Sequence, residues 1–322
     1  MSPVREAAPR HPPVRLLGHV ARRIDRLSDR KFAVVSFIPG SLLVATVVLP
    51  PIIAVLVMSL YRIELLKLGP SSFIDIDNYT RAFRDAGFVA TIPRTLIFAA
   101  ASTAVAIPLA LVCAHFLTKA FRGATLLGVV LLLPWAIAPV VTGVYWRFIF
   151  QGNFGLVNGI LKAVGVDNPP IWLNSGDTAT VVAVIANVWR SLPLLALILL
   201  AALKGVPQAL YRAARLDGAR PWQSFRYVTL PSIKNALIVA IVLQLILSLQ
   251  VFDIIFTLTG GGPGDQTRVI SYHIYLRAFG DLSFGYSAAL AVILLGFTAA
   301  ASALLLYPAL SRRAERVRGK AS

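Results

Sequence analysis

Two glutamines and an aspartate interrupt an apolar stretch near residue 250, and their chemistry suits binding rather than catalysis. The amides of Gln244 and Gln250 can both donate to and accept from hydroxyl groups, and Asp253 follows three residues later. Polar groups inside a long apolar segment are costly, so they usually have a function. We therefore expect these side chains to contact a solute, with a hydrogen bond between helices as the alternative. For Asp253, a position at a membrane surface is a further alternative.

A second group of candidate binding residues lies in two other apolar segments. Asn187, Trp189 and Arg190 are close together in one of them, and Tyr286 begins the last one. Trp189 is either a platform on which a ring can stack or an interfacial anchor, and anchoring is the commoner role. Arg190 either binds an anionic group or extends toward lipid headgroups, which is again the commoner role.

Motifs for covalent chemistry, metal binding and nucleotide binding are absent from the sequence. It contains no G-x-S-x-G, no H-E-x-x-H and no Walker motif. The glycine-rich run Gly260–Gly264 is not followed by the lysine of a phosphate-binding loop, so we interpret it as a turn. Cys113 is the single cysteine, and the four histidines include no i, i+4 pair. We expect no catalytic residue, no metal and no cofactor in this chain.

The composition indicates an all-α integral membrane protein. Hydrophobic residues make up 57% of the 322 residues and charged residues only 14%, about half the charged share of a soluble domain. The net charge of +17 does not indicate nucleic-acid binding, because the basic residues lie beside apolar segments. Prolines within most of these segments predict bends, as at Pro134 and Pro139. The six segments long enough to span a bilayer are 33–60, 90–118, 124–149, 179–203, 235–258 and 284–308.

The distribution of lysine and arginine predicts that both ends of the chain lie in the cytoplasm. With the N-terminus inside, the cytoplasmic pieces hold 21 Lys and Arg residues, whereas the outer loops hold 7. We expect a basic cytoplasmic tail over 1–31, a transmembrane domain over 32–310 and a second basic tail over 311–322. A charged cytoplasmic insert, 204–235, joins the fourth and fifth spans.

The core of this insert, "PQALYRAARLDGARPWQSFRYVTLP" (207–231), predicts two short helices. Pro207 and Pro221 suit the first turn of a helix, and Gly218 can end the first helix in a left-handed conformation. We expect the helices to meet near Asp217 and Gly218, and Pro231 to close the insert and open the next span. The first helix would present Leu210, Ala213, Ala214 and Asp217 on a small face and Arg212 and Arg215 on a basic face. The alternative is an amphipathic loop whose arginines contact lipid phosphate.

The insert resembles the EAA loop of permease subunits in bacterial ABC importers. That pattern is E-A-A, three residues, Gly, nine residues, then I-x-L-P; this chain has R-A-A from Arg212, Gly218 and V-T-L-P ending at Pro231, at the same spacing. The usual glutamate is replaced by Arg212, so an ion pair of that glutamate does not carry over. In the family this loop docks on an ATPase subunit. The resemblance therefore implies a coupling role for Leu210, Arg212, Ala213, Ala214, Asp217, Gly218 and Ala219.

Three further stretches, 187–207, 252–267 and 276–295, resemble the carbohydrate-uptake permeases of the maltose and glycerol-phosphate group. The resemblance implies an importer subunit in the bacterial cytoplasmic membrane that forms half of the pathway for a sugar or polyol. It also implies three partners: a second permease in a heterodimer, a dimeric ABC ATPase that binds the ATP, and an extracytoplasmic solute-binding protein. It places Gln250 where such permeases contact sugar. The alternatives are a permease for another solute, a channel or secondary transporter, and a membrane enzyme.

Overall fold

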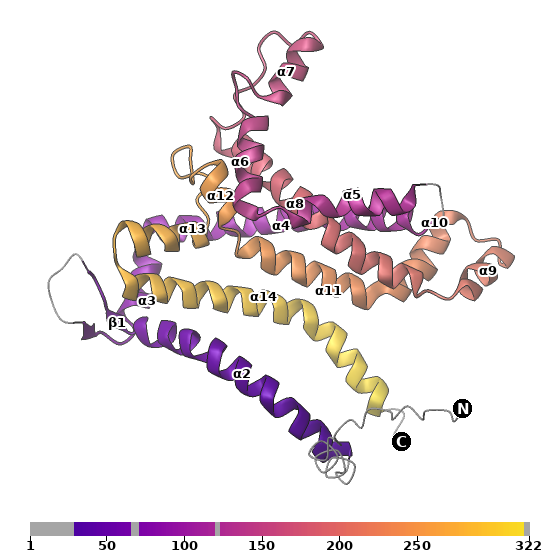
Figure 1. Cartoon of the computed structure of the whole chain (residues 1–322), viewed down its shortest axis with the longest axis horizontal. Helices are drawn as coiled ribbons and strands as arrows, with labels where there is room; N and C mark the ends of the chain where they lie inside the picture. Colours follow the sequence, from indigo (N-terminus) through magenta and orange to yellow (C-terminus); the bar gives the residue numbers. More distant parts are fainter. Residues whose placement is uncertain (1–28, 66–70, 120–122, 319–322) are drawn as a thin grey trace, which may run out of the picture. The chain divides into compact units, whose positions relative to one another are not determined.

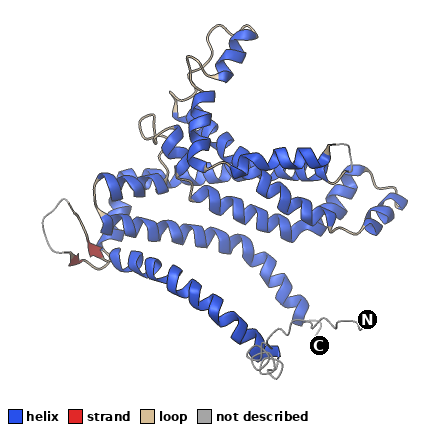
Figure 2. Cartoon of the chain, viewed as in Figure 1, coloured by secondary structure: helices blue, strands red, loops and turns tan. Residues whose placement is uncertain are grey.

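Helices make up most of the chain that the structure describes, which is residues 29–65, 71–119 and 123–318 of a computed structural model (Figure 2). The predicted tail 1–31 lies outside these residues except for its last three, and so do 319–322 of the second tail. The chain divides into two units, 1–54 and 55–322. The first contains most of α2 (Asp29–Met58), an apolar helix that holds Pro39, Pro50 and Pro51 without a break.

The second unit begins with a short two-stranded antiparallel hairpin in which Tyr61 pairs with Phe73. Twelve further α-helices follow within the described residues, and two of them continue into π-helical turns. In chain order the elements are β1 (Tyr61–Arg62), β2 (Ser72–Phe73), α3 (Asp77–Arg84), α4 (Ala86–Leu117), α5 (Ala124–Ala136), α6 (Pro139–Ile149), α7 (Leu156–Ala163), α8 (Gly176–Lys204), α9 (Gln208–Leu216), α10 (Pro221–Ser224) with a π turn (Phe225–Thr229), α11 (Leu230–Leu249), α12 (Asp253–Leu258), α13 (Ile270–Tyr275) with a π turn (Leu276–Gly280), and α14 (Phe284–Arg318).

Membrane-spanning helices account for all six predicted segments. Among the described residues, five helices are long and apolar enough to cross a bilayer, and a bent pair of helices brings the number to six where it is counted as one span. The five are Phe37–Met58, Ala86–Leu117, Gly176–Lys204, Pro221–Leu249 and Phe284–Tyr307.

The third predicted span, 124–149, is not one straight helix. α5 and α6 meet at an angle of 99° across Ile137 and Ala138, which both have extended backbone. The residue before a proline disfavours the helical region, and Pro139 opens α6 as its first residue. The proline therefore bends the segment as the sequence predicts, but to a near right angle.

The fifth predicted span, 235–258, differs at both ends from the observed helix. The helix begins at Pro221, passes through the π turn and ends at Leu249. Gln250, Val251 and Phe252 then leave the helix before α12 begins at Asp253. Apolar residues lie on both sides of this break and only Gln250 and Asp253 interrupt them there, so hydropathy over a whole span does not locate it.

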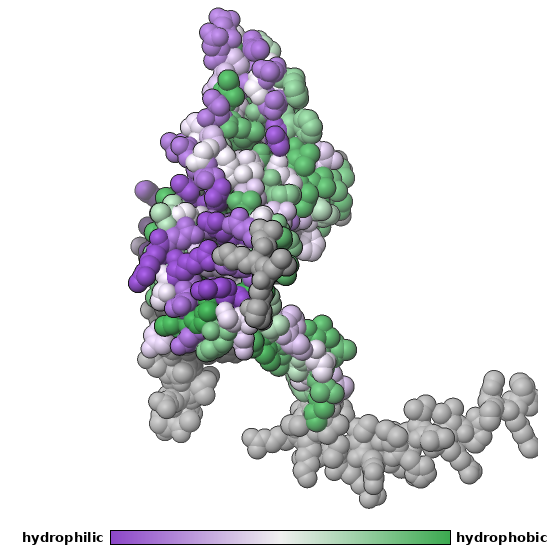
Figure 3. All heavy atoms as spheres, turned by 90° about the vertical axis from the view of Figure 1, so that its left-hand side faces the viewer, coloured by the Kyte–Doolittle hydropathy of each residue, from purple (hydrophilic) through white to green (hydrophobic). Residues whose placement is uncertain are grey.

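Small residues allow the central helices of the second unit to pack closely. Ala106, Ala110 and Ala114 of α4 are fully buried, as are Ala183 and Ala186 of α8, and α11 packs against both helices. α14 packs on α11, α13 and α3 (Figure 1). At the end of the unit where α3 and α13 lie, hydrophilic side chains gather on the surface (Figure 3). That end is suited to lie outside the hydrocarbon layer.

Candidate functional site: the 207–231 insert and a broken span

The first helix of the 207–231 insert ends in a Schellman motif. Asp217 is the C-cap of α9, and Gly218 has a left-handed backbone with φ +73°. The amide of Gly218 donates to the carbonyl of Arg215 at 3.1 Å, and that of Ala219 donates to Ala214 at 2.9 Å. The predicted helix end at Asp217 and Gly218 is thus confirmed.

The second helix of the insert is continuous with the fifth span. Pro221 opens α10, and the side chain of Gln223 accepts from the amide of Arg220 at 2.7 Å. Pro231 lies in the first turn of α11, as predicted for a residue that opens the next span, but it does not close the insert, because the helix runs on without a break from Pro221. The π turn just before it shifts the hydrogen-bond pattern, with the amide of Leu230 donating to Phe225, so the helix passes the proline without a break.

α9 stands outside the packed helices and has no fully buried side chain. Figure 1 shows it beyond the ends of α8 and α11. The hydroxyl groups of Tyr211 and Thr229 lie 3.0 Å apart and join α9 to the π turn. Of the predicted coupling residues, Ala214 and Ala219 are half-buried, and the exposed ones are Leu210, Arg212, Ala213, Asp217 and Gly218.

The structure brings Asn187 of α8 and Gln244 of α11 together on one hydroxyl group. The amide nitrogen of Asn187 donates to Ser248 Oγ at 3.0 Å, and that of Gln244 donates to the same oxygen at 3.1 Å. All three side chains are buried. This geometry matches the alternative of a hydrogen bond between helices for Asn187 and Gln244.

Three other predicted pathway residues lie around the break in the fifth span. Gln250 caps the end of α11 and is exposed, and Asp253 is the first residue of α12. Arg190 Nε is buried without a hydrogen-bond partner among the described residues, and the carboxylate of Asp253 acts on this arginine electrostatically. A broken span of this kind exposes backbone and side-chain polar groups at membrane depth, which suits solute binding.

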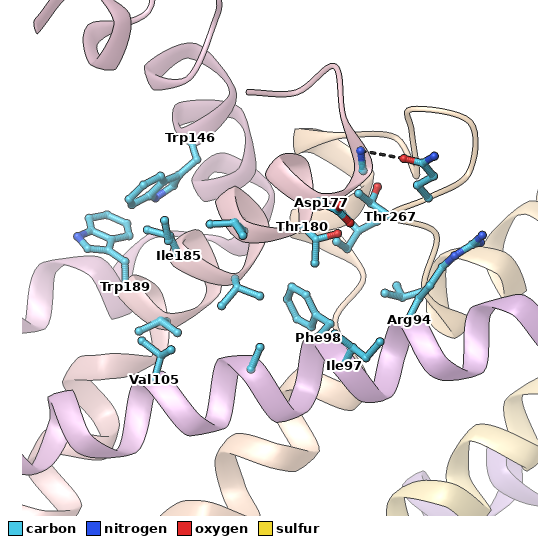
Figure 4. Close-up of a pocket in the computed structure, with 18 of the residues that line it drawn as sticks. Arg94, Ile97, Phe98, Val105, Trp146, Asp177, Thr180, Ile185, Trp189 and Thr267 are labelled. Carbon is cyan, nitrogen blue, oxygen red and sulfur yellow. Dashed lines mark hydrogen bonds between the residues drawn. The ribbon is translucent and has the colours of Figure 1, made fainter. Parts of the chain in front are cut away.

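Trp189 lies on a different side of α8, at a cavity of about 1060 Å³. Its ring meets that of Trp146 edge to face, with centroids 5.9 Å apart. Figure 4 shows both tryptophans at one end of the cavity and Arg94, Asp177 and Thr180 toward the other. The apolar middle is formed by α4 and α8. The sequence did not reveal this cavity, because its walls come from segments that are far apart in the chain.

The hydroxyl group of Tyr286 is engaged by Asp85 rather than open to a solute. Tyr286 is only 2% exposed, and its hydroxyl donates to Asp85 Oδ2 at 2.9 Å. Asp85 Oδ1 caps α4 by accepting from the amides of Gly87 and Phe88. Arg277 Nη2 donates to Asp85 Oδ2 at 3.1 Å. Tyr286 thus links the start of α14 to the start of α4.

Further ionic contacts complete this arrangement, which we call the Asp85 cluster: Arg81, Asp85, His273, Arg277, Asp281 and Tyr286. Burial raises the pKa of Asp85, but the hydrogen bond from Tyr286, the charge of Arg277 and the two backbone amides outweigh it and lower that pKa. Burial and the charge of Arg277 lower the pKa of His273 to about 4. His273 is therefore neutral, and its Nε2 accepts from Arg277 Nε at 3.2 Å.

The glycine-rich run forms a tight turn. Gly260, Gly261 and Gly264 have positive φ angles, and a Cβ on Gly261 would lie 2.8 Å from the ring of Tyr272. Thr267 Oγ1 donates to the carbonyl of Gly262 at 2.8 Å. The predicted turn is confirmed.

Comparisons with known proteins agree with this architecture. A model of the family "binding-protein-dependent transport system inner membrane component" matches residues 106–316. The sulfoquinovosyl glycerol transport system permease protein SmoG of Agrobacterium fabrum is 31% identical over 280 residues, covering 87% of this chain and 91% of that protein. The trehalose/maltose transport system permease protein MalF of Thermococcus litoralis is 34% identical over 280 residues, covering 87% and 93%.

The fold is also that of a solved transporter. A chain of a bacterial ABC transporter involved in the import of the acidic polysaccharide alginate superposes with a TM-score of 0.74 at 21% identity, covering 93% of this chain and 99% of that one. The family match spans more than half of the chain, and it includes the insert and the broken span. This chain belongs to the inner membrane components of binding-protein-dependent transport systems, the permease subunits of ABC importers.

Proposed function

We propose that this permease forms half of the translocation pathway of an ATP-driven importer for a sugar or related polyol, and that the 207–231 insert couples it to the ATPase. The observation that carries the proposal is the joining of an exposed helix, α9, to a continuous helix that reaches the broken span. The permease makes no covalent bond to its solute. It opens and closes the pathway along which the solute crosses the membrane.

This permease would have four kinds of partner. These are the bilayer, a second permease, a dimeric ATPase that binds the ATP, and an extracytoplasmic solute-binding protein. The family description names a binding protein, and a related alginate transporter was solved with a periplasmic protein. The threefold excess of Lys and Arg supports both termini and the insert lying in the cytoplasm.

The continuous helix from Pro221 to Leu249 explains how motion would pass through the membrane. It holds 29 residues, which corresponds to a length of about 43 Å. Closure of the ATPase dimer would displace α9, and the helix would carry the displacement to its far end at Gln250. There the break between α11 and α12 would rearrange, and the side chains around it would meet or release the solute.

The sugar class is supported by the relatives and by the chemistry of the break. SmoG is named for a sulfoquinovosyl glycerol system, and MalF for a trehalose/maltose system. The exposed amide of Gln250 can pair with hydroxyl groups in both directions. Trp189 of α8 and Trp146 of α6 offer apolar ring faces at the separate cavity between α4 and α8.

Gly218→Val tests the coupling role of the insert. A β-branched residue is strained at φ +73°, so the end of α9 should unwind, at a cost of about 1–3 kcal/mol. We expect solute-stimulated ATP hydrolysis and uptake to fall about tenfold or more in membrane vesicles, while insertion and thermal stability of the bundle are retained. Gly159→Val is the control, because Gly159 lies in helix α7 with nothing within 4 Å of a Cβ. Normal coupled transport by Gly218→Val would refute the coupling role.

A further inference from the structure

The insert carries a strong positive charge that the described chain does not neutralise. Residues 204–235 hold six Lys and Arg residues and one acidic residue, Asp217. Arg212, in the middle of α9, is exposed and makes no ion pair with any residue that the structure describes. Arg215 differs, because its Nε donates to the carbonyl of Tyr211 at 3.3 Å. The guanidinium of Arg212 is thus free to meet a partner.

Large apolar side chains are exposed on the same insert. Leu216 at the end of α9 is 89% exposed, and Trp222 and Tyr227 on the following helix are 68% and 74% exposed. A mixture of apolar and aromatic side chains with arginine is typical of the centre of a protein–protein interface. An arginine buried in such an interface is costly unless a carboxylate of the partner pairs with it.

We propose that α9 inserts into an acidic depression on the ATPase subunit, and that a carboxylate of this subunit pairs with Arg212. This inference rests on the coupling role proposed above. The pairing makes Arg212 a residue that selects the partner: it accepts an ATPase with an acidic depression and repels one whose depression is basic. In the related loops, the glutamate at this position would instead favour an ATPase whose depression is basic.

Lipid phosphate is the competing partner for the arginines of the insert. α9 lies beyond the ends of the spanning helices α8 and α11 (Figure 1) and buries none of its side chains fully, so its surface is accessible to a protein partner. The structure therefore favours the ATPase.

The test measures binding of the ATPase that co-purifies with the wild-type importer, in detergent without lipid. Full-length permease variants are reconstituted with the second permease, and the dissociation constant of the ATPase is determined at low and high salt. We expect Arg212→Ala to weaken binding about tenfold and Arg212→Glu about a hundredfold. Binding of the wild type should weaken with salt, and that of Arg212→Ala should depend on salt less. Lys162→Glu, an equal charge change on the exposed face of α7, should have no effect.

Leu216→Asp separates this inference from the coupling role. If Leu216→Asp releases the ATPase and Arg212→Glu does not, the insert docks but the charge pairing is refuted, and lipid becomes the partner of Arg212. If neither variant changes binding, the coupling role itself fails. If Arg212→Glu releases the ATPase, an Asp or Glu to Lys change selected in the ATPase for restored uptake should recover binding and identify the carboxylate.

Discussion

The 207–231 insert and the Asp85 cluster both contain several arginines, and they use them in opposite ways. In the cluster, Arg277 is paired with Asp85 and Asp281, and Arg81 lies 4.3 Å from the ring centre of Tyr286. In the insert, Arg212 points to solvent without a carboxylate. An arginine that pairs with carboxylates of its own chain holds helices together. An exposed arginine without such a pair indicates a surface that binds a partner. The two regions therefore predict different consequences of mutation.

Removing Asp85 should have the largest effect on stability. Asp85→Ala leaves Arg277 and Tyr286 without their shared acceptor and removes the cap of α4. We expect the free energy of unfolding in detergent to fall by about 3–4 kcal/mol. Asp77→Ala, at the exposed first turn of α3, is the matched control and should cost less than about 1 kcal/mol. If Asp77→Ala lowered the free energy of unfolding as much as Asp85→Ala, the Asp85 cluster would stabilise the fold no more than an exposed surface residue does.

Acid should weaken the cluster and leave the insert unaffected. Unfolded His273 binds a proton below pH 6.5, whereas folded His273 binds it only below about 4. The unfolded state therefore binds more protons in this window, so stability should fall by up to about 3 kcal/mol as the pH is lowered through it. Asp85, whose pKa is also lowered, adds a loss in the same direction below its ordinary value of 3.8.

The measurement is the unfolding temperature of wild type and His273→Gln between pH 7 and 4. Glutamine keeps an acceptor for Arg277 and does not titrate, so its curve should be flatter. Parallel curves would assign the pH dependence to other groups.

Gln250 and Gln244 show the same contrast between an exposed side chain and one bonded within the chain. Substitutions at these two positions should have the smallest effects. Gln250→Ala should lower uptake about fivefold, corresponding to about 1 kcal/mol, without changing the unfolding temperature, because the side chain is exposed. Gln244→Ala should lower the unfolding temperature, because Ser248 loses a buried partner. Wild-type uptake by Gln250→Ala would remove this amide from the pathway.

Local patterns predicted much of the molecule. Apolar length located all six spans, and Pro221 and Gly218 correctly predicted the start of one short helix and the end of the other. These features depend on residues that are neighbours in sequence, so their physics is visible without a fold. The same holds for the turn at Gly260–Gly264.

Features that depend on distant residues could not be predicted. Asp85 meets Arg277 and Tyr286 across 192 and 201 positions. Gln250 and Asp253 mark the break in the sequence, but polar residues alone do not predict the end of a helix, and α12 packs against α6 and α8 at this point. For Tyr286, the sequence suggested a solute contact because the structural partner, Asp85, lies at the start of a different helix.

α9 is joined to the rest of the described chain by its two chain connections, by the hydrogen bond between Tyr211 and Thr229, and by packing of Tyr211 on the hydrophobic core. The helix behind it, Pro221–Leu249, keeps its shape through its own backbone and through packing on α4, α8 and α14. The nine residues of α9 can therefore be exchanged without changing the helix that follows them. If Gln208–Leu216 is exchanged between related permeases, the recipient permease should bind the ATPase of the donor and still transport its own solute.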